Sequence, residues 1–181
     1  MKNQLKSGVI WITGLSGAGK TTFATALYNY LKPKHHNVIL FDGEVFRDIF
    51  EDYGYERENR IKSSIQFNAL IQFLEKNDLI LIAATISAFD EIYKLNRKNF
   101  QNYFEIYIHC DFNELVRRDK NGLYSGALKG EIKNVVGVDI PFEEPQAHFV
   151  LENSELGGIP EKSARLCREV DAFLAKIHGK P

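Results

Sequence analysis

The amino-acid sequence predicts an α/β fold in which a mainly parallel sheet is covered by helices on both faces. Short apolar runs that suit strands alternate along the chain with amphipathic segments that suit helices, and this alternation is typical of parallel sheets with helical crossovers. The 181 residues, 44% of them hydrophobic, are enough for one core of ordinary size. We therefore expect a single domain over residues 1–181, built as a three-layer sandwich.

Five segments are predicted to be strands. Leu79–Ala83 is apolar throughout, as expected for a strand that is buried on both faces of a sheet. The others are rich in β-branched, aliphatic or aromatic residues. They are Val9–Thr13, Val38–Phe41, Phe104–His109 and His148–Leu151.

Helices are predicted between these strands. Thr21–Leu31 follows a glycine-rich turn and is ended by Pro33, whereas Pro160 begins the last helix. Shorter helices are expected at Asp90–Lys98 and Asn113–Arg118. In Glu58–Lys76 apolar side chains recur at every fourth position, and we expect this face to point into the core. That face comprises Ile61, Ile65, Ala69 and Phe73, with Leu70 and Leu74 beside it.

The turn after the first strand carries a phosphate-binding motif. Its residues, Gly14-Leu15-Ser16-Gly17-Ala18-Gly19-Lys20-Thr21, fit G-x-x-x-x-G-K-[ST] in full, and Thr22 follows in the helix. In such a loop backbone N–H groups cradle phosphates, Lys20 reaches the β- and γ-phosphates, and the Thr21 hydroxyl binds Mg²⁺. The helix adds its positive N-terminal end. The sequence therefore predicts a P-loop NTPase fold that binds ATP or GTP with Mg²⁺.

The position of the nearby acid distinguishes among P-loop classes. A GTPase would carry a base-reading Asn-Lys-x-Asp segment, which the sequence lacks. A motor ATPase usually has an acid at the end of a later apolar strand, but residues 84–87 after Leu79–Ala83 contain none. Asp42 follows the second strand instead, as in many small-molecule kinases. There it can orient the acceptor hydroxyl, accept its proton or hold Mg²⁺ through water. The alternative is a helix cap before residues 44–50.

Residues Lys120–Pro145 show no clean period, and we interpret them as part of a mobile lid over about residues 118–147. The segment Arg117–Lys133 holds five basic and two acidic residues. A basic lid can close over polyphosphate and exclude water, although a solvated loop is the simpler alternative. Arg47 and Arg60 are expected on the acceptor side, where arginine suits anion binding.

Composition excludes several classes of partner. The 23 basic and 24 acidic residues give a net charge of −1, which argues against a nucleic-acid-binding protein. No apolar run is long enough for a membrane helix, and residues 1–8 lack the apolar core of a signal peptide. Cys110 and Cys167 are the only cysteines. We therefore expect a cytoplasmic protein without membrane or nucleic-acid partners.

A set of motifs spread over about residues 9–151 resembles adenylylsulfate (APS) kinases. They are Gly14–Thr21, Asp42-Gly43-Glu44, Ile86-Ser87, Arg118-Asp119, Gly122-Leu123-Tyr124, Gly130–Asn134, Gly137-Val138-Asp139 and Pro141-Phe142-Glu143. The resemblance implies transfer of the γ-phosphate of MgATP to the ribose 3′-hydroxyl of a nucleotide whose 5′-phosphate carries a second anionic group. It also implies a homodimer. From the length of 181 residues we expect the kinase domain without a fused second catalytic domain.

The chain departs from the family pattern on the acceptor side. Glu44 and Val45 replace the family's Asp-Asn before Arg47. The family has an Arg followed three residues later by an Asn. An ungapped alignment matches these to Arg60 and Ser63, whereas a gapped one uses Arg57 and Asn59. Further on, Asn121 replaces a lysine and Ala88 replaces a proline.

The departure with the largest consequence concerns the acceptor base. The family clamps adenine between two phenylalanines, and here Tyr55 matches the first and Val135 the second. Because an aromatic stacking partner contributes roughly 1–3 kcal/mol per base, its loss disfavours an adenine nucleotide and leaves room for a pyrimidine. This combination resembles the branch of the family that acts on cytidine 5′-diphosphoramidate in capsule phosphoramidate synthesis, with APS as the alternative acceptor.

The resemblance assigns a role to each candidate residue. Lys20 stabilises the transferring phosphoryl group, Asp42 orients or deprotonates the hydroxyl, and Ser87 matches a serine described in the family as a phosphoserine intermediate. We expect direct transfer, with Ser87 as a substrate contact or a plain turn residue. Arg118 is expected to bind ATP by neutralising phosphate charge from the lid. The acceptor-side set is Glu44, Arg47, Tyr55, Arg60, Ser63, Ile86, Ser87, Asn121, Lys133 and Val135. A non-catalytic nucleotide-binding protein is the alternative of another class.

Overall fold

The structure, a computed structural model, describes residues 7–43, 45–46, 54–177 and 179. Its centre is a five-stranded sheet with the strand order β2-β3-β1-β4-β5, and every pair of neighbouring strands is parallel. The strands are β1 (Gly8–Thr13), β2 (Val38–Asp42), β3 (Ile80–Ala84), β4 (Tyr103–His109) and β5 (Phe149–Glu152). The predicted α/β class is confirmed, and each predicted strand lies within a residue of the observed one.

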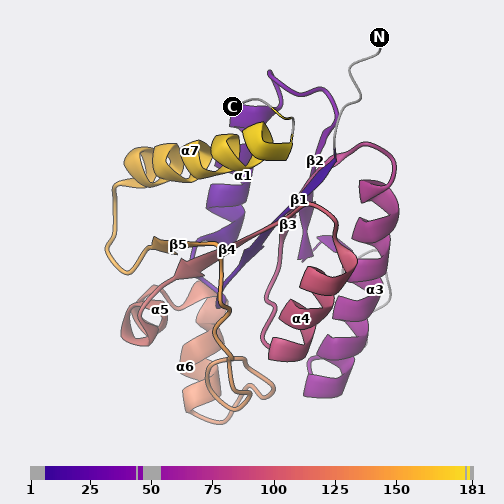
Figure 1. Cartoon of the computed structure of the whole chain (residues 1–181). Coiled ribbons are helices and arrows are strands. Elements are labelled where there is room, and N and C mark those ends of the chain that lie inside the picture. Colours follow the sequence, from indigo (N-terminus) through magenta and orange to yellow (C-terminus); the bar gives the residue numbers. More distant parts are fainter. Residues whose placement is uncertain (1–6, 44, 47–53, 178, 180–181) are drawn as a thin grey trace.

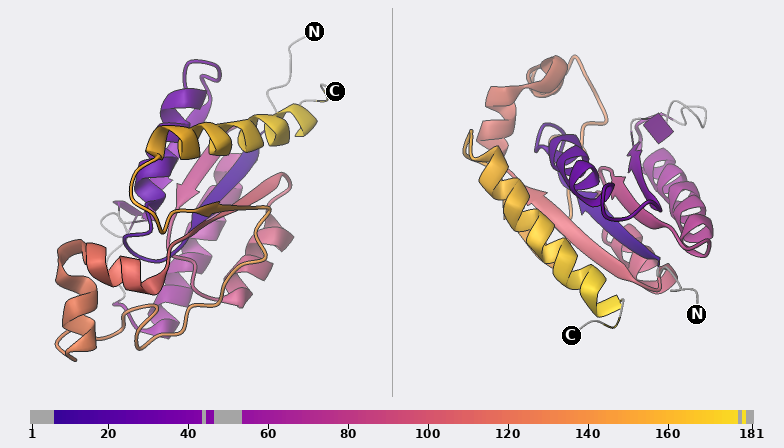
Figure 2. Two further views of the ribbon diagram at one scale, coloured as in Figure 1. Left: turned by 90° about the vertical axis from the view of Figure 1, so that its left-hand side faces the viewer. Right: turned by 90° about the horizontal axis from the view of Figure 1, so that it is seen from above.

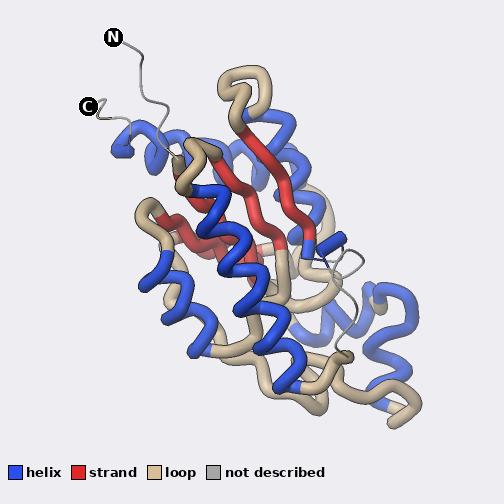
Figure 3. The backbone as a smooth tube through the Cα atoms, turned by 90° about the vertical axis from the view of Figure 1, so that its right-hand side faces the viewer, coloured by secondary structure: helices blue, strands red, loops and turns tan. Residues whose placement is uncertain are grey.

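Helices cover both faces of the sheet. On one face lie α1 (Lys20–Leu31) and α7 (Ile159–Ile177), and on the other lie α3 (Arg57–Glu75) and α4 (Asp90–Asn99), as Figures 1 and 2 show. From the side shown in Figure 3, α3 and α4 lie next to each other in front of the strands. The short α5 (Phe112–Arg118), η1 (Lys120–Gly122) and α6 (Leu123–Leu128) follow β4.

The central strand β1 separates two cores. All six of its residues are buried, and successive side chains point to opposite faces of the sheet. Ile10 and Ile12 therefore pack with the residues of α1 and α7, whereas Val9 and Trp11 pack beneath α3. The Trp11 ring lies 5.4 Å from that of Phe67. Because all strands run the same way, their carboxyl ends meet at one edge, where such folds place ligands.

The buried face of α3 differs from the predicted one. Ile65 and Phe73 are 48% and 64% exposed. The buried residues are instead Phe67, Asn68, Ile71 and Glu75. This face includes polar groups with buried partners: Asn68 donates to Asn96 at 2.8 Å, and Glu75 accepts from the backbone of Gln101 at 3.1 Å. Those polar residues break the apolar period, which is why periodicity selected another face.

The segment interpreted as a lid without regular structure contains the helices η1 and α6. The Asp119 carboxylate accepts hydrogen bonds from the backbone N–H groups of Tyr124 (2.8 Å) and Ser125 (3.1 Å) and so caps the first turn of α6. Such a short helix has no room for a hydrophobic period. Among the described residues, no helix is both long and apolar enough to cross a membrane.

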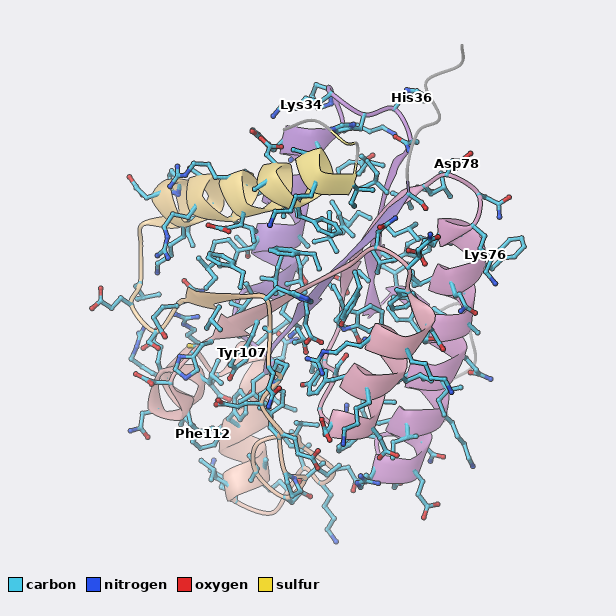
Figure 4. The ribbon with its side chains drawn as sticks, viewed as in Figure 1. Lys34, His36, Lys76, Asp78, Tyr107 and Phe112 are labelled. Atoms are coloured by element: carbon cyan, nitrogen blue, oxygen red, sulfur yellow. The ribbon has the colours of Figure 1, made fainter. Side chains whose placement is uncertain are left out.

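Figure 4 shows where six labelled side chains lie relative to the lid. Lys34, His36, Lys76 and Asp78 lie at the end of the molecule away from the lid, and Tyr107 and Phe112 lie nearer to it. Phe112 packs edge-on against Tyr124 of α6, with ring centroids 5.5 Å apart. The lid helix is thereby held against α5.

Candidate active site

A cavity of about 920 Å³ lies at the carboxyl edge of the sheet. Four parts of the chain enclose it: the phosphate loop, the segments after β2 and β3, one face of α3, and the lid. Among the predicted site residues its lining includes Ser16, Gly17, Gly19, Lys20, Thr21, Thr22, Tyr55, Arg60, Ser63, Ile86, Arg118, Asn121, Lys133 and Val135. The structure therefore gathers into one cavity most of the residues selected from the sequence.

Backbone geometry makes two glycines of the phosphate loop obligatory. Gly14 and Gly19 have φ values of 149° and 108°, which residues with a Cβ atom rarely adopt. A Cβ on Gly14 would lie 2.5 Å from the Ile108 carbonyl oxygen, and one on Gly19 would lie 2.8 Å from Asn153 Nδ2. The loop is thus pressed against β4 and the segment after β5. Lys20 begins α1, so the helix amino end faces the cavity as phosphate binding requires.

Two buried side chains that sequence reasoning missed brace this loop. The Tyr124 hydroxyl donates to the Ser16 carbonyl at 2.9 Å, and burial raises the pKa of Tyr124 to about 12, so it remains a donor. Asn153 Nδ2 donates to the Ala18 carbonyl at 2.8 Å. Tyr124 belongs to one of the motifs noted above, whereas Asn153 had only its place after a predicted strand as a signal.

Arg118 is fixed beside the phosphate loop. Its Nη1 donates to the Gly17 carbonyl at 3.1 Å and its Nη2 to the Asn153 carbonyl at 2.6 Å. Its Nε donates to Glu114 at 2.8 Å. Hydrogen bonds from Arg117 and then Arg118 lower the pKa of Glu114 to about 2. The anchored guanidinium lines the cavity beside the phosphate loop.

Of the basic lid residues, Lys120 and Lys133 also line the cavity. Arg117 pairs with Glu114 at 2.6 Å and does not line the cavity, and neither does Lys129. The net positive charge of the segment is therefore only partly directed at the site.

The two predicted metal-binding residues are in contact. The Thr21 hydroxyl donates to Asp42 Oδ2 at 2.8 Å, which joins the phosphate loop to the end of β2. A hydroxyl and a carboxylate are hard oxygen donors of the kind that Mg²⁺ prefers, and Mg²⁺ bound with a nucleotide needs only one or two protein ligands. The pair fits a Mg²⁺ ion shared with the phosphates of ATP.

One face of α3 forms the opposite wall. Arg60, Ser63, Ser64 and Phe67 follow the spacing i, i+3, i+4, i+7 and all line the cavity. Phe67 packs edge-on against Phe46, with ring centroids 4.7 Å apart. Sequence reasoning included Arg60 and Ser63 but missed Ser64, Phe67 and Phe46.

The candidate base-binding residues lie at this wall and in the lid. Tyr55 is 51% exposed and Val135 is 4% exposed, and both line the cavity. The Arg60 guanidinium lies 5.3 Å from the centre of the Tyr55 ring. Arg57 instead pairs with Glu91 at 2.8 Å and does not line the cavity. The geometry therefore favours the ungapped alignment with Arg60 and Ser63.

Ser87 lies outside the cavity lining. It is 1% exposed, and its Oγ accepts a hydrogen bond from Trp11 Nε1 at 2.9 Å. Its backbone N–H donates to Thr13 Oγ1 at 3.1 Å. The expected catalytic or substrate-binding role does not fit this placement, because the hydroxyl points into the core. The alternative of a turn residue between strand and helix fits, and the preceding Ile86 reaches the cavity.

The remaining predicted residues divide into two groups. Gly14, Leu15 and Ala18 shape the phosphate loop without lining the cavity, and the Leu15 carbonyl accepts a hydrogen bond from Lys20 Nζ at 2.9 Å. Glu44 and Arg47 lie outside the described residues, as does most of the helix expected over residues 44–50.

Comparisons with known proteins identify relatives of the chain. Residues 6–152 match the family model described as adenylylsulphate kinase. The cytidine diphosphoramidate kinase of Campylobacter jejuni is 48% identical over 154 residues, covering 85% of this chain and 91% of that protein. A probable adenylyl-sulfate kinase of Archaeoglobus fulgidus is 39% identical over 150 residues, covering 82% of this chain and 97% of that protein.

Solved structures give the same result for the fold. The APS kinase of Mycobacterium tuberculosis, in complex with AMPPNP and APS, superposes with a TM-score of 0.82 at 26% identity. The match covers 93% of this chain and 98% of that one. The arrangement of strands and helices is thus shared along nearly the whole length of both chains.

Proposed function

The chain belongs to the adenylylsulfate kinase family, and we propose that its acceptor is the ribose 3′-hydroxyl of cytidine 5′-diphosphoramidate. Membership makes it a kinase that transfers phosphate from ATP to a nucleotide hydroxyl. The observation that carries the choice of acceptor is Val135, an aliphatic side chain lining the cavity where the family resemblance places a phenylalanine. The similarity to the Campylobacter jejuni enzyme supports the same choice.

The proposed reaction is an in-line transfer. The 3′-oxygen attacks the γ-phosphorus, the bond from that phosphorus to the oxygen of ADP breaks, and the hydroxyl proton passes to Asp42. Lys20 stabilises the charge on the transferring group, and the phosphate loop holds the rest of the triphosphate. Bound at Thr21 and Asp42, Mg²⁺ would neutralise phosphate charge. We propose no covalent serine intermediate, because the Ser87 hydroxyl faces Trp11 in the core.

The acceptor would bind between α3 and the lid. Arg60 supplies a planar cation suited to the 5′ anionic group, and Lys133 adds positive charge from the lid. Tyr55 would stack on the cytosine ring, with the smaller Val135 in place of a second aromatic ring. Together with the fixed Arg118 on the nucleotide side, these residues line one continuous cavity.

A substrate panel tests the proposal. With MgATP and purified protein, we expect ADP release with cytidine diphosphoramidate to have a kcat/KM about 5- to 150-fold higher than with APS. This range corresponds to the roughly 1–3 kcal/mol that one aromatic stacking partner contributes to binding a base. In the variant Val135→Phe the value for APS should rise, because a second aromatic ring is restored.

The panel separates the alternatives. A higher kcat/KM with APS would make the protein an adenylylsulfate kinase and leave the reaction type intact. Nucleotide binding without ADP release from any 5′-substituted acceptor would identify a non-catalytic P-loop protein.

We also propose a cytoplasmic homodimer that acts in capsule phosphoramidate synthesis, as one kinase domain with its lid over about residues 118–147. The support is the family resemblance, together with Cys110 and Cys167, both buried and unbridged, which suit a reducing compartment.

A further inference from the structure

The lid segment 134–140 forms a compact loop closed by one carboxylate. Asp139 Oδ2 accepts a hydrogen bond from the Asn134 backbone N–H at 2.7 Å, and Oδ1 accepts one from the Val135 N–H at 2.6 Å. The Val135 carbonyl in turn accepts from the N–H groups of Val138, Asp139 and Ile140 at 3.1–3.2 Å. The carboxylate thus satisfies two backbone donors at the point where the lid turns into the cavity.

The same loop holds a residue of the acceptor wall. Arg60 Nη2 donates to the Asn134 carbonyl at 2.9 Å, and Arg60 Nε donates to the Tyr55 carbonyl at 2.7 Å. Asn134 adopts a left-handed conformation with φ of 64°, which the hydrogen bond from its N–H to Asp139 helps to maintain. Asp139, Asn134 and Arg60 therefore form a chain of contacts from the lid to α3.

Packing keeps the loop in register with the rest of the site. Val136 and Ile140 are buried with Ala88 and Phe89 in a small apolar cluster. Leu15 of the phosphate loop packs against the same cluster, and a Cβ on Gly137 would lie 3.2 Å from its side chain. Because the loop is packed against these neighbours, a change in its backbone would alter the acceptor wall.

We propose that Asp139 is a positioning residue for the acceptor site: by fixing the Asn134 carbonyl it sets the orientation of the Arg60 guanidinium that binds the acceptor's anionic group. This inference rests on the proposed function, since it assumes that Arg60 binds the acceptor. It assigns Asp139 no contact with substrate.

The carboxylate remains ionised over the working pH range. Loss of hydration raises the pKa of Asp139, but the backbone hydrogen bonds, chiefly from Asn134 and Val135, and the charge of Arg60 outweigh it and leave the pKa below its ordinary value. An ionised carboxylate accepts stronger hydrogen bonds from backbone N–H groups than a neutral side chain does. The substitution Asp139→Asn would remove that charge and turn an amide donor toward one of the two N–H groups.

The first experiment measures the loop without any substrate. In Asp139→Asn we expect faster hydrogen exchange at the Asn134 and Val135 amides than in the parent protein. The matched control is Asp171→Asn on α7, a carboxylate that pairs with Lys34 at 3.4 Å on a different face and should leave these amides unchanged. Equal exchange rates in the parent and Asp139→Asn would overturn the proposal.

The second experiment is a double-mutant cycle with Arg60→Ala. Asp139→Asn alone should raise the acceptor KM about tenfold or more, as expected when a positioning contact is lost, with the KM for ATP unchanged within about twofold. In the Arg60→Ala background the same change should alter the acceptor KM less than about twofold, because the two residues act through one contact. Equal effects in both backgrounds, or a matching rise in the KM for ATP, would contradict the inference.

The two proposals can fail separately. If only APS is phosphorylated, the choice of cytidine diphosphoramidate fails and the cycle is measured with APS. If cytidine diphosphoramidate is the better substrate but the cycle is additive, the function holds and the role of Asp139 fails. If neither nucleotide is phosphorylated, both are overturned.

Discussion

At the scale of single residues, the chemistry of the site depends on which atoms are already engaged. Thr21 and Ser87 each lie in the segment that follows a strand, and the sequence makes each a candidate for contact with substrate or metal. Thr21 reaches Asp42 at 2.8 Å beside the cavity, whereas Ser87 Oγ is engaged by the Trp11 indole at 2.9 Å. A local motif cannot distinguish the two, because Trp11 and Ser87 are 76 positions apart.

The variant Asp42→Asn tests the central residue of the mechanism. An amide cannot accept the hydroxyl proton, so we expect kcat to fall by about 100-fold or more, the usual scale of general-base catalysis. The asparagine oxygen can still accept the hydrogen bond from Thr21. Because the proposed Mg²⁺ site loses its carboxylate, we expect the affinity for MgATP to fall as well. Steady-state kinetics and nucleotide titration measure the two effects. A kcat near that of the parent would reduce Asp42 to a structural or capping role.

At the scale of elements, α3 shows that a helix is easier to predict than its orientation. Its bounds, Arg57–Glu75, differ by a single residue from the predicted ones. Its apolar residues, however, extend around much of its circumference. Packing against the sheet turns Phe67 and Ile71 inward. Phe67 contacts the ring of Trp11 in β1 and the ring of Phe46, which follows β2. The same face continues into the cavity as Arg60 and Ser63.

Two phenylalanines of α3 provide a matched test of this orientation. Phe67→Ala should lower the free energy of unfolding by about 3–5 kcal/mol, the usual cost of removing a buried aromatic ring. Phe73→Ala, at a position 64% exposed, should cost less than about 0.5 kcal/mol. Urea denaturation measures both. Equal costs, or a larger cost at Phe73, would mean that α3 packs with the face that periodicity predicted.

At the scale of the whole molecule, the parallel sheet brings distant segments to one edge. The phosphate loop, the ends of β2 and β3, and the lid meet there because all strands point the same way. After the lid the chain returns to the sheet, and His148, just before β5, contacts β4. The Glu105 backbone N–H donates to His148 Nδ1 at 2.9 Å, and the imidazole stacks on Phe104.

This contact predicts a pH dependence of global stability. Shielding of the imidazole from water lowers the pKa of His148 below 6.5, and the charge of Arg97 adds to the effect against the opposing charge of Glu105. As pH falls through 6.5 the unfolded chain is protonated first, so stability is lost between that pH and the folded-state pKa. Above this window His148 is neutral in both states and contributes no pH dependence.

The variant His148→Gln isolates the effect. Glutamine keeps an oxygen that can accept the hydrogen bond from Glu105 but does not titrate. We expect the free energy of unfolding of the parent to decrease between about pH 7 and pH 5.5, and to decrease less steeply in the variant. Urea denaturation at a series of pH values measures the two slopes, and identical slopes would rule out a contribution from His148.

Much of this protein follows from its sequence because the relevant signals are local. The alternation of strands and helices, the glycine-rich loop with Lys20 and Thr21, and the acid after the second strand all depend on neighbours in the chain. They were sufficient to predict the fold class and the edge of the sheet where the cavity lies. The family resemblance added the reaction type and most of the residues that we propose for the acceptor.

The tertiary structure decided the contacts between segments that are far apart in the chain. The Tyr124 and Asn153 braces span 108 and 135 positions to reach Ser16 and Ala18, and Arg60 reaches Asn134 across 74. The burial of Ser87 and the inward face of α3 belong to the same class. Such contacts depend on how whole elements pack, and packing selects among several local patterns that are equally compatible with the sequence.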